Sequence, residues 1–308
     1  MTIFSILAAL LLQQFRPRPN APSWGMLVER FAAFLERYFN AGDHRYGVLA
    51  WGITMLAILA ACSGITYLLG SISAIFVWLL NAAVLYFTLG FRGPLWCLGH
   101  IQHALRTDDL ERARSLLGQL MGRPAPAGDR TQITRLAIEQ GILQGHRELF
   151  GVLFWFIILP GPAGALIYPA AWVLARAWST GTAPDEREFG WFATQALEWL
   201  DWIPQRLTAL SFAIVGNFED ALYCWRSQAE AWGHPMEGIL LASGAGALGV
   251  RLGEPLSEPS GIRLRTELGA GENPDADYLQ SVEGMLWRCL VLWLSVITLV
   301  TLAGWVGG

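Results

Sequence analysis

Lysine is absent from this chain of 308 residues, and charged residues of either sign are absent from three long stretches. Residues 46–91, 149–175 and 289–308 contain no Asp, Glu, Lys or Arg over 46, 27 and 20 positions. Even a buried helix of a water-soluble domain shows solvent a polar edge at regular intervals, so these runs exclude a water-soluble protein. A membrane crossing needs about 20 apolar residues at a rise of about 1.5 Å each. The first run therefore fits two crossings and the last fits one.

Other absences exclude whole classes of site. The four cysteines carry no paired spacing, so neither a disulfide framework nor a zinc motif is indicated. The sequence contains no dinucleotide fingerprint, serine elbow or zincin motif, and the glycine-rich segment 242–249 lacks the lysine of a Walker loop. Cys97, His100 and His103 drift around a helix and would converge poorly, so we expect no metal site. No strand-like alternation occurs, and the predicted fold is all-α.

The apolar runs predict a polytopic helical integral membrane protein that forms a single domain over 1–308. We expect transmembrane helices over 48–69, 72–90 and 287–306, with the tight turn of the first pair at Gly70-Ser71. Tryptophans at both ends of the last span are suited to anchor it at the interfaces.

The run 149–175 differs from the others because Pro160-Gly161-Pro162-Ala163-Gly164 interrupts it. Proline removes amide donors and clashes with the preceding turn, so a straight helix is excluded. The alternatives are a kinked crossing and a broken or re-entrant hairpin. We favour the hairpin, whereas a kinked crossing would place the acidic segment that follows on the opposite side of the membrane.

The distribution of arginines predicts the orientation of the chain in the membrane. Both flanks of the first helix pair are rich in arginine, as cytoplasmic segments are. We therefore expect cytoplasmic helical segments over 15–45, 92–147 and 179–285, and an external carboxyl terminus. The expected location is the bacterial inner (cytoplasmic) membrane, crossed several times. Within the last of these segments, Pro204 predicts the start of a helix, and 252–277 reads as an exposed loop.

Several motifs resemble those of one family over nearly the whole chain. They are Leu98-x-His100, Met121-Gly122-Arg123, Arg135-x-Ala137-Ile138-Glu139, Pro204-x-Arg206-Leu207-Thr208, His234-Pro235 and Gly246-Ala247-Leu248-Gly249-Val250-Arg251-Leu252-Gly253. The chain resembles the membrane-bound CobD/CbiB superfamily, the adenosylcobinamide-phosphate synthases of cobalamin biosynthesis. The resemblance implies an enzyme that joins aminopropanol phosphate to a corrinoid carboxyl group and consumes ATP.

The chain departs from that family at its acidic motifs. The positions read Gln13-Gln14-Phe15-Arg16-Pro17, Gly122-Arg123-Pro124 and Ile142-Leu143-Gln144, where the family carries aspartate, glutamate and asparagine. Magnesium needs oxygen ligands, chiefly carboxylates. We therefore expect no catalysis, and ATP and Mg²⁺ enter only if the synthase activity is retained.

A second branch of the superfamily lacks the same acids. Leu153-Phe154-Trp155, Leu174-x-Arg176-Ala177-Trp178 and Asp201-Trp202-Ile203-Pro204 resemble AmpE, an inner-membrane accessory protein linked to β-lactamase induction. This resemblance implies a non-catalytic accessory or sensor that binds an anionic small molecule. The synthase remains the alternative.

Seven charged residues match the superfamily and are the expected ligand-binding set: Arg114, Arg123, Arg135, Glu139, Arg206, Glu237 and Arg251. We expect Glu139 to orient Arg135 as an i, i+4 helical pair. The competing interpretation is that such arginines only contact lipid phosphates or set topology. The expected partners are the lipid bilayer and an anionic small molecule or a corrinoid, with no nucleic acid; no catalytic residue is assigned.

Overall fold

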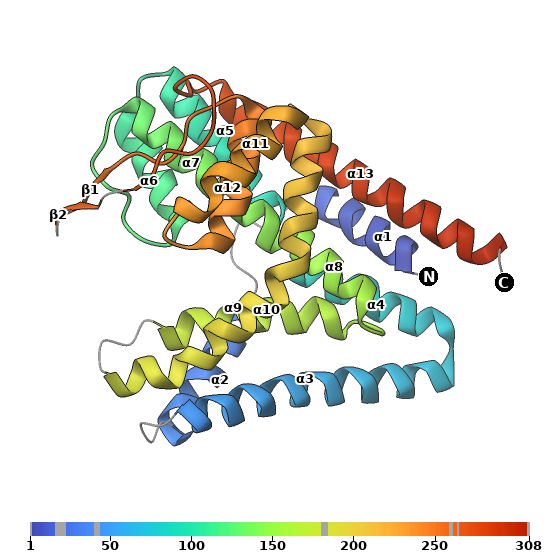
Figure 1. Ribbon diagram of the computed structural model, residues 1–308. Coiled ribbons are helices and arrows are strands. Elements are labelled where there is room, and N and C mark those ends of the chain that lie inside the picture. Colours follow the sequence, from blue (N-terminus) through green and yellow to red (C-terminus); the bar gives the residue numbers. More distant parts are fainter. Residues whose placement is uncertain are drawn as a thin grey trace. The chain divides into compact units, whose positions relative to one another are not determined.

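The computed structural model describes residues 2–15, 23–39, 44–179, 184–258, 261–263 and 265–306 (Figure 1). Part of the expected cytoplasmic segment 15–45, including Arg16 and Arg18, lies outside them. The described chain is helical apart from one short two-stranded ribbon, which confirms the all-α prediction. The elements are α1 (Thr2–Phe15), α2 (Ser23–Phe39), α3 (His44–Ile72), α4 (Ala74–Thr88), α5 (Arg92–Arg106), α6 (Leu110–Met121), α7 (Arg130–Gly145), η1 (His146–Phe150), α8 (Gly151–Ile158), α9 (Ala163–Ser179), α10 (Pro184–Val215), α11 (Phe218–Gln228), η2 (Ala229–Ala231), α12 (Pro235–Leu248), β1 (Leu256–Glu258), β2 (Gly261–Arg263) and α13 (Tyr278–Val306).

The chain divides into two compact units. Unit 1 comprises Met1–Gly90 and Arg147–Pro204, and unit 2 comprises Phe91–His146 and Gln205–Gly308. The chain passes between the units after α4, at the π-helical turn η1 and at Pro204 within α10.

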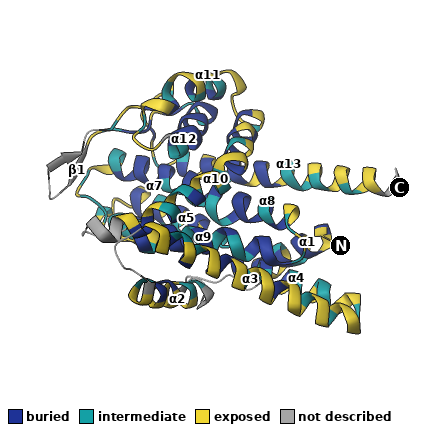
Figure 2. Ribbon diagram, turned by 60° about the horizontal axis from the view of Figure 1, so that its bottom comes forward, coloured by how far each residue is buried: buried dark blue, intermediate teal, exposed yellow. Residues whose placement is uncertain are grey.

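Three helical stretches are long and apolar enough to cross a membrane. They are His44–Ile72, Ala74–Arg106, which includes α4 and α5, and Tyr278–Gly304. Figure 2 shows exposed residues along α3 and along the carboxyl-terminal part of α13. Long apolar helices with exposed side chains indicate a membrane protein.

The turn between the first two of these helices lies two residues later than expected. Helix α3 continues through Gly70 and Ser71 to Ile72, and the break falls at Ser73. The Ser73 hydroxyl oxygen accepts a hydrogen bond from the Ile75 amide at 3.4 Å. Ser73 therefore caps the start of α4, and Gly70 stays within α3.

Helices α8 and α9 form an antiparallel hairpin. The chain reverses between Leu159 and Ala163, and the two helices pack so closely that glycine is required at two contacts. A Cβ on Gly164 would lie 1.9 Å from the Trp155 carbonyl oxygen, and one on Gly151 would lie 2.4 Å from the Tyr168 ring. The run 149–175 therefore turns back within unit 1 at its Pro-Gly break.

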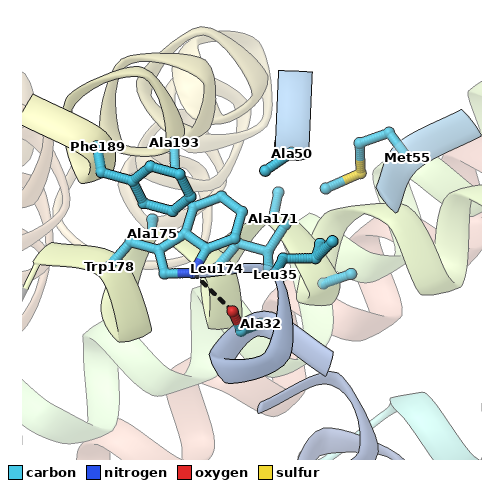
Figure 3. Close-up of a cluster of buried hydrophobic side chains, with 11 residues drawn as sticks. Ala32, Leu35, Ala50, Met55, Ala171, Leu174, Ala175, Trp178, Phe189 and Ala193 are labelled. Carbon is cyan, nitrogen blue, oxygen red and sulfur yellow. Dashed lines mark hydrogen bonds between the residues drawn. The ribbon is translucent and has the colours of Figure 1, made fainter. Parts of the chain in front are cut away.

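The core of unit 1 is apolar and built mainly from small residues. Trp178 fills its centre, edge-to-face with Phe189 at 4.9 Å between ring centroids (Figure 3). The indole N–H donates to the Ala32 carbonyl oxygen at 3.2 Å, so the one polar atom of this side chain is satisfied. The other buried members are Leu35, Ala50, Met55, Ala170, Ala171, Leu174, Ala175 and Ala193.

Two expectations for the region after residue 200 are wrong. Helix α10 does not begin at Pro204 but runs through it, from Pro184 to Val215. The segment 252–277 is not simply an exposed loop, because Leu252 and Leu268 are buried and form an antiparallel bridge. It also contains the ribbon, in which Leu256 pairs with Arg263.

Candidate functional site

Helix α7 is the central helix of unit 2. Asp129 caps it by accepting a hydrogen bond from the Gln132 amide at 2.8 Å. Helices α5, α6, α12 and α13 pack around it, and most of its residues are buried on every side. A helix surrounded in this way has no solvent-facing side for charged residues, so each of its charges needs a protein partner.

Arg135, in the middle of α7, is one of those buried charges. Its side chain is 5% exposed, and its guanidinium pairs with Glu254 and donates to the Asn273 amide oxygen at 2.8 Å. Its Nε has no hydrogen-bond partner among the described residues. Burial lowers the pKa of Arg135, and the negative charge of Asp129 is the strongest opposing effect. The guanidinium nevertheless stays charged at any physiological pH.

Glu139 lies one turn further along α7 and is equally buried. Its carboxylate pairs with Arg265 and accepts a hydrogen bond from the Gly253 amide at 3.1 Å. The Arg265 guanidinium in turn lies 4.6 Å from the centre of the Trp232 ring. Burial raises the pKa of Glu139, whereas the Arg265 charge lowers it. A buried carboxylate with a charged partner and a backbone donor is a satisfied group.

These contacts define what we call the α7 cluster: Arg135, Glu139, Glu254, Arg265 and Asn273. Three of its five members come from one segment, residues 249–273, which we call the strap. The strap is held by backbone bridges between Val250 and Glu272 and between Leu252 and Leu268. Gly253 has a φ of +73°, and a Cβ there would lie 2.2 Å from the Thr266 carbonyl oxygen. The strap can therefore donate this amide to Glu139 only with glycine at the position.

The structure joins four of the seven residues expected from the sequence. Arg135 and Glu139 belong to the cluster, the charge of Glu237 acts on Glu139, and the charge of Arg251 acts on Arg135. Arg251 is exposed and its Nε donates to the Gly271 carbonyl oxygen at 2.7 Å.

The contacts that define the cluster do not include the other three. Arg114 pairs with Glu111 at 2.6 Å on α6, Arg123 is exposed in the turn after α6, and Arg206 is half-buried on α10.

The expected direct pairing of Arg135 with Glu139 is wrong. The two side chains interact electrostatically along the helix, but the strap provides the direct partner of each: Glu254 for Arg135 and Arg265 for Glu139. A partner from another segment can approach a buried side chain end-on, which an i, i+4 neighbour on the same helix does not. Sequence reasoning missed Glu254, Arg265 and Asn273 because a Gly-, Pro- and acid-rich segment reads as a solvated loop.

The positions where the family carries metal-binding acids are occupied by structural amides. The Gln13 side-chain amide donates to the Leu89 carbonyl oxygen, and that of Gln144 donates to the Leu120 carbonyl oxygen. Both carbonyls lie at the end of a helix, so the amides join neighbouring helices. Within the described ranges no group of three or more His, Cys, Asp or Glu side chains could hold a metal ion. These residues do not fit a magnesium–ATP site.

The histidines near Cys97 are likewise engaged in local packing. His100 lies against the Trp96 ring, with 3.9 Å between centroids, and its Nδ1 is 2.9 Å from the Trp96 carbonyl oxygen. This contact explains the residue as a helix-surface side chain.

The fold and the cluster together define a helical membrane protein with a buried arginine–carboxylate centre in one of its two units. The family model described as CobD/Cbib protein matches residues 6–305. The chain belongs to the CobD/CbiB family, as its motifs predict.

The relatives agree with that assignment. A Cobalamin biosynthesis protein CobD from Stutzerimonas stutzeri is 32% identical over 96% of this chain and 97% of its own length. A protein of the same description from Chromobacterium violaceum is 33% identical over 70% of this chain and 68% of its own length. The corresponding values for Streptococcus sanguinis are 24%, 97% and 97%. No solved structure matches the chain.

Proposed function

We propose that this protein acts in cobalamin biosynthesis by binding an anionic small molecule, a corrinoid carboxylate or a phosphate-bearing amine, at the α7 cluster. The observation that carries the proposal is Arg135, a buried guanidinium whose Nε has no hydrogen-bond partner in the described part of the chain. The pathway is proposed from the names of the relatives. The AmpE-like accessory role gains no support from these relatives.

The cluster gives an anion a route to Arg135. Glu254, which holds the guanidinium, is 42% exposed, whereas Arg135 itself is 5% exposed. An incoming carboxylate or phosphate would replace the Glu254 carboxylate and gain the same charge-assisted contact. Arg251 would add a second positive charge from the strap. We propose Arg114, Arg123 and Glu237 as peripheral members of the same site.

The proposed activity is binding without amide formation. Its support is that Gln13 and Gln144 are engaged as helix-joining amides at the family's acidic positions. A second candidate is the synthase reaction itself, which is favoured by the similarity to CobD proteins over 96% of the chain. Only this second candidate implies ATP and Mg²⁺, and we derive no step through them.

The binding site is tested with Arg135→Gln. Losing one charge-assisted contact costs about 1.5–3 kcal/mol, so affinity should fall roughly ten- to a hundredfold. Calorimetry of the purified protein with aminopropanol phosphate, cobyric acid and ATP measures it. Arg112→Gln, an exposed arginine on α6, is the matched control. Arg263 in the strap is a less suitable control than Arg112, because its side chain lies outside the described residues. Equal affinities in Arg135→Gln and Arg112→Gln would mean that the arginines only set topology.

Complementation separates the two candidates. We expect no growth on cobyric acid when this protein is supplied to a strain that lacks cobinamide-phosphate synthase. Growth would establish the synthase, whereas ligand binding without growth would establish the binding function.

We further propose a multi-pass topology in the bacterial inner membrane, with 149–175 re-entrant and 92–147 cytoplasmic. The support is that Arg147 and Arg176 both stack on Trp172, at 5.2 and 5.4 Å from the ring centre. The antiparallel hairpin α8–α9 thus has its flanking arginines at the same end. Arginine and tryptophan together are typical of the headgroup level of a membrane.

Labelling with an impermeant maleimide tests this topology. Leu120 is buried, so the exposed Ser115 on α6 is the better position. In a Cys97→Ser background, Ser115→Cys should stay unlabelled in intact spheroplasts, and a cysteine added after Gly308 should react. Labelling of position 115 from outside would overturn the orientation.

A further inference from the structure

The second half of α10, residues 205–215, has an inside-out distribution of side chains. Its polar residues Gln205, Thr208 and Ser211 are 1%, 0% and 6% exposed, and Arg206 is half-buried. Of its large apolar residues, Phe212 is buried, whereas Leu207, Leu210 and Ile214 are 40%, 39% and 53% exposed. An amphipathic helix in water shows the opposite arrangement, with its apolar stripe toward the core.

The three buried polar side chains each form a hydrogen bond within unit 2, although Gln205 Oε1 has no partner among the described residues. The Thr208 hydroxyl lies 2.9 Å from His146 Nδ1, and the Gln205 amide donates to the Met236 carbonyl oxygen. Polar side chains that face the bundle interior and bond across helices are the pattern expected where the surroundings are hydrocarbon. These residues are therefore placed as in a membrane helix.

Contacts with α13 place this half of α10 beside a candidate membrane span. The Trp293 indole N–H donates to the Ser211 hydroxyl oxygen at 2.9 Å, and Arg288 donates to the Val215 carbonyl oxygen at 2.9 Å. Arg288 is the last charged residue before the charge-free run 289–308. Ser211 therefore lies at about the same depth in the membrane as the second helical turn of the run 289–308.

The exposed apolar side chains of unit 2 are concentrated around this contact. Apart from Trp96, every exposed large hydrophobic side chain that the structure describes in unit 2 belongs to α10, α11 or α13. On α13, Val291 is 60% exposed, and the exposed apolar residues continue toward the end of the helix. The apolar surface of α10 is thus continuous with that of the span.

From these observations we propose that residues 205–215 enter the bilayer and that acyl chains cover Leu207, Leu210 and Ile214. Eleven residues rise about 16 Å, roughly half of a hydrocarbon core of about 30 Å. The segment is therefore a half-membrane helix laid against α13. It would form a lipid-contact surface within the stretch 179–285 that arginine counting assigns to the cytoplasm, and it does not depend on the proposed ligand.

Spin-label accessibility in lipid nanodiscs tests the proposal. Leu210→Cys and Ile214→Cys are each labelled with a nitroxide in a Cys97→Ser background, since Cys62, Cys224 and Cys289 are buried. The matched control is Ser115→Cys on the exposed face of α6. Oxygen concentrates in hydrocarbon and a polar nickel chelate stays in water. We expect oxygen to relax the labels at 210 and 214 more than nickel does, and the reverse at 115.

Two outcomes would overturn the proposal. Nickel accessibility at 210 and 214 equal to that at 115 would mean that water covers this face. Protection of both labels from oxygen and from nickel would mean that protein covers it instead. The unmodified Cys97→Ser protein, carried through the same labelling, gives the background signal. Because both positions are exposed, neither substitution removes a core contact, and retained helicity checks the fold.

Discussion

The two units bury their polar groups in different ways. The core of unit 1 is built from small apolar residues around Trp178. The indole N–H of Trp178 makes a polar contact in this core by donating to the Ala32 carbonyl oxygen (Figure 3). The central helix of unit 2 buries Arg135 and Glu139, and a strap supplies a charged partner to each. Apolar packing needs no particular partner, whereas a buried charge does. The core around Trp178 in unit 1 therefore depends on packing, whereas the central helix of unit 2 depends on particular charged partners.

The same difference holds for single carboxylates. In unit 2, Glu139 has Arg265 and the Gly253 amide as direct partners. In unit 1, burial raises the pKa of Glu148 to about 8, and only the charge of the adjacent Arg147 opposes it. Burial is the largest cause of a raised pKa at both carboxyls, but at Glu139 the Arg265 ion pair and the Gly253 amide oppose it directly and favour the charged form.

The largest effect is expected in the apolar core. Trp178→Ala leaves a large cavity and removes the hydrogen bond to Ala32, and should cost about 3–5 kcal/mol of stability. Trp178→Phe is the matched variant, because it loses the N–H but keeps most of the ring, and should cost clearly less. Unfolding followed by circular dichroism in detergent measures both. If the two variants melt alike, packing around Trp178 does not hold unit 1 together.

A somewhat smaller loss is expected from breaking the buried ion pair of unit 2. Arg265→Met leaves the Glu139 carboxylate buried without its partner, which should cost about 3 kcal/mol. Adding Glu139→Gln should recover part of that loss, since the uncompensated charge is then gone. Arg106→Gln is the control, because the Arg106–Asp277 pair is 55% and 69% exposed and should contribute less than about 1 kcal/mol. Equal losses from Arg265→Met and Arg106→Gln would contradict the distinction.

A dependence of stability on pH is expected from Glu148 in unit 1. Glu148 has a pKa of about 8 in the folded protein and an ordinary value of 4.5. Between these values the folded state holds a proton that the unfolded chain has released, so stability falls as pH rises through this window. Glu148→Gln should flatten that slope. Glu111→Gln, on an 82% exposed side chain, should leave it unchanged. An unaltered slope in Glu148→Gln would show that burial does not govern this carboxyl.

Particular residues show how far the sequence reached into the site. Arg135 and Glu139 were found because they match a family motif on a helix, and both are central to the cluster. Their partners Glu254 and Arg265 lie more than a hundred residues away, in a segment whose composition is that of a loop. Local periodicity carries no information on which distant segment packs over a helix, so the expected i, i+4 pair was wrong.

The sequence by itself determined that this is a helical membrane protein, because charge-free runs of this length are stable only in hydrocarbon. It also predicted a break in the run 149–175 at Pro160 to Gly164, but the antiparallel packing of α8 on α9 comes from the structure. Only the tertiary structure decided which face of a helix points inward. The sequence of residues 205–215 gives a helix a polar and an apolar face whether that helix lies in water or in lipid. The orientation follows from neighbours such as Trp293 and His146, which bond the polar face and leave the apolar one outside.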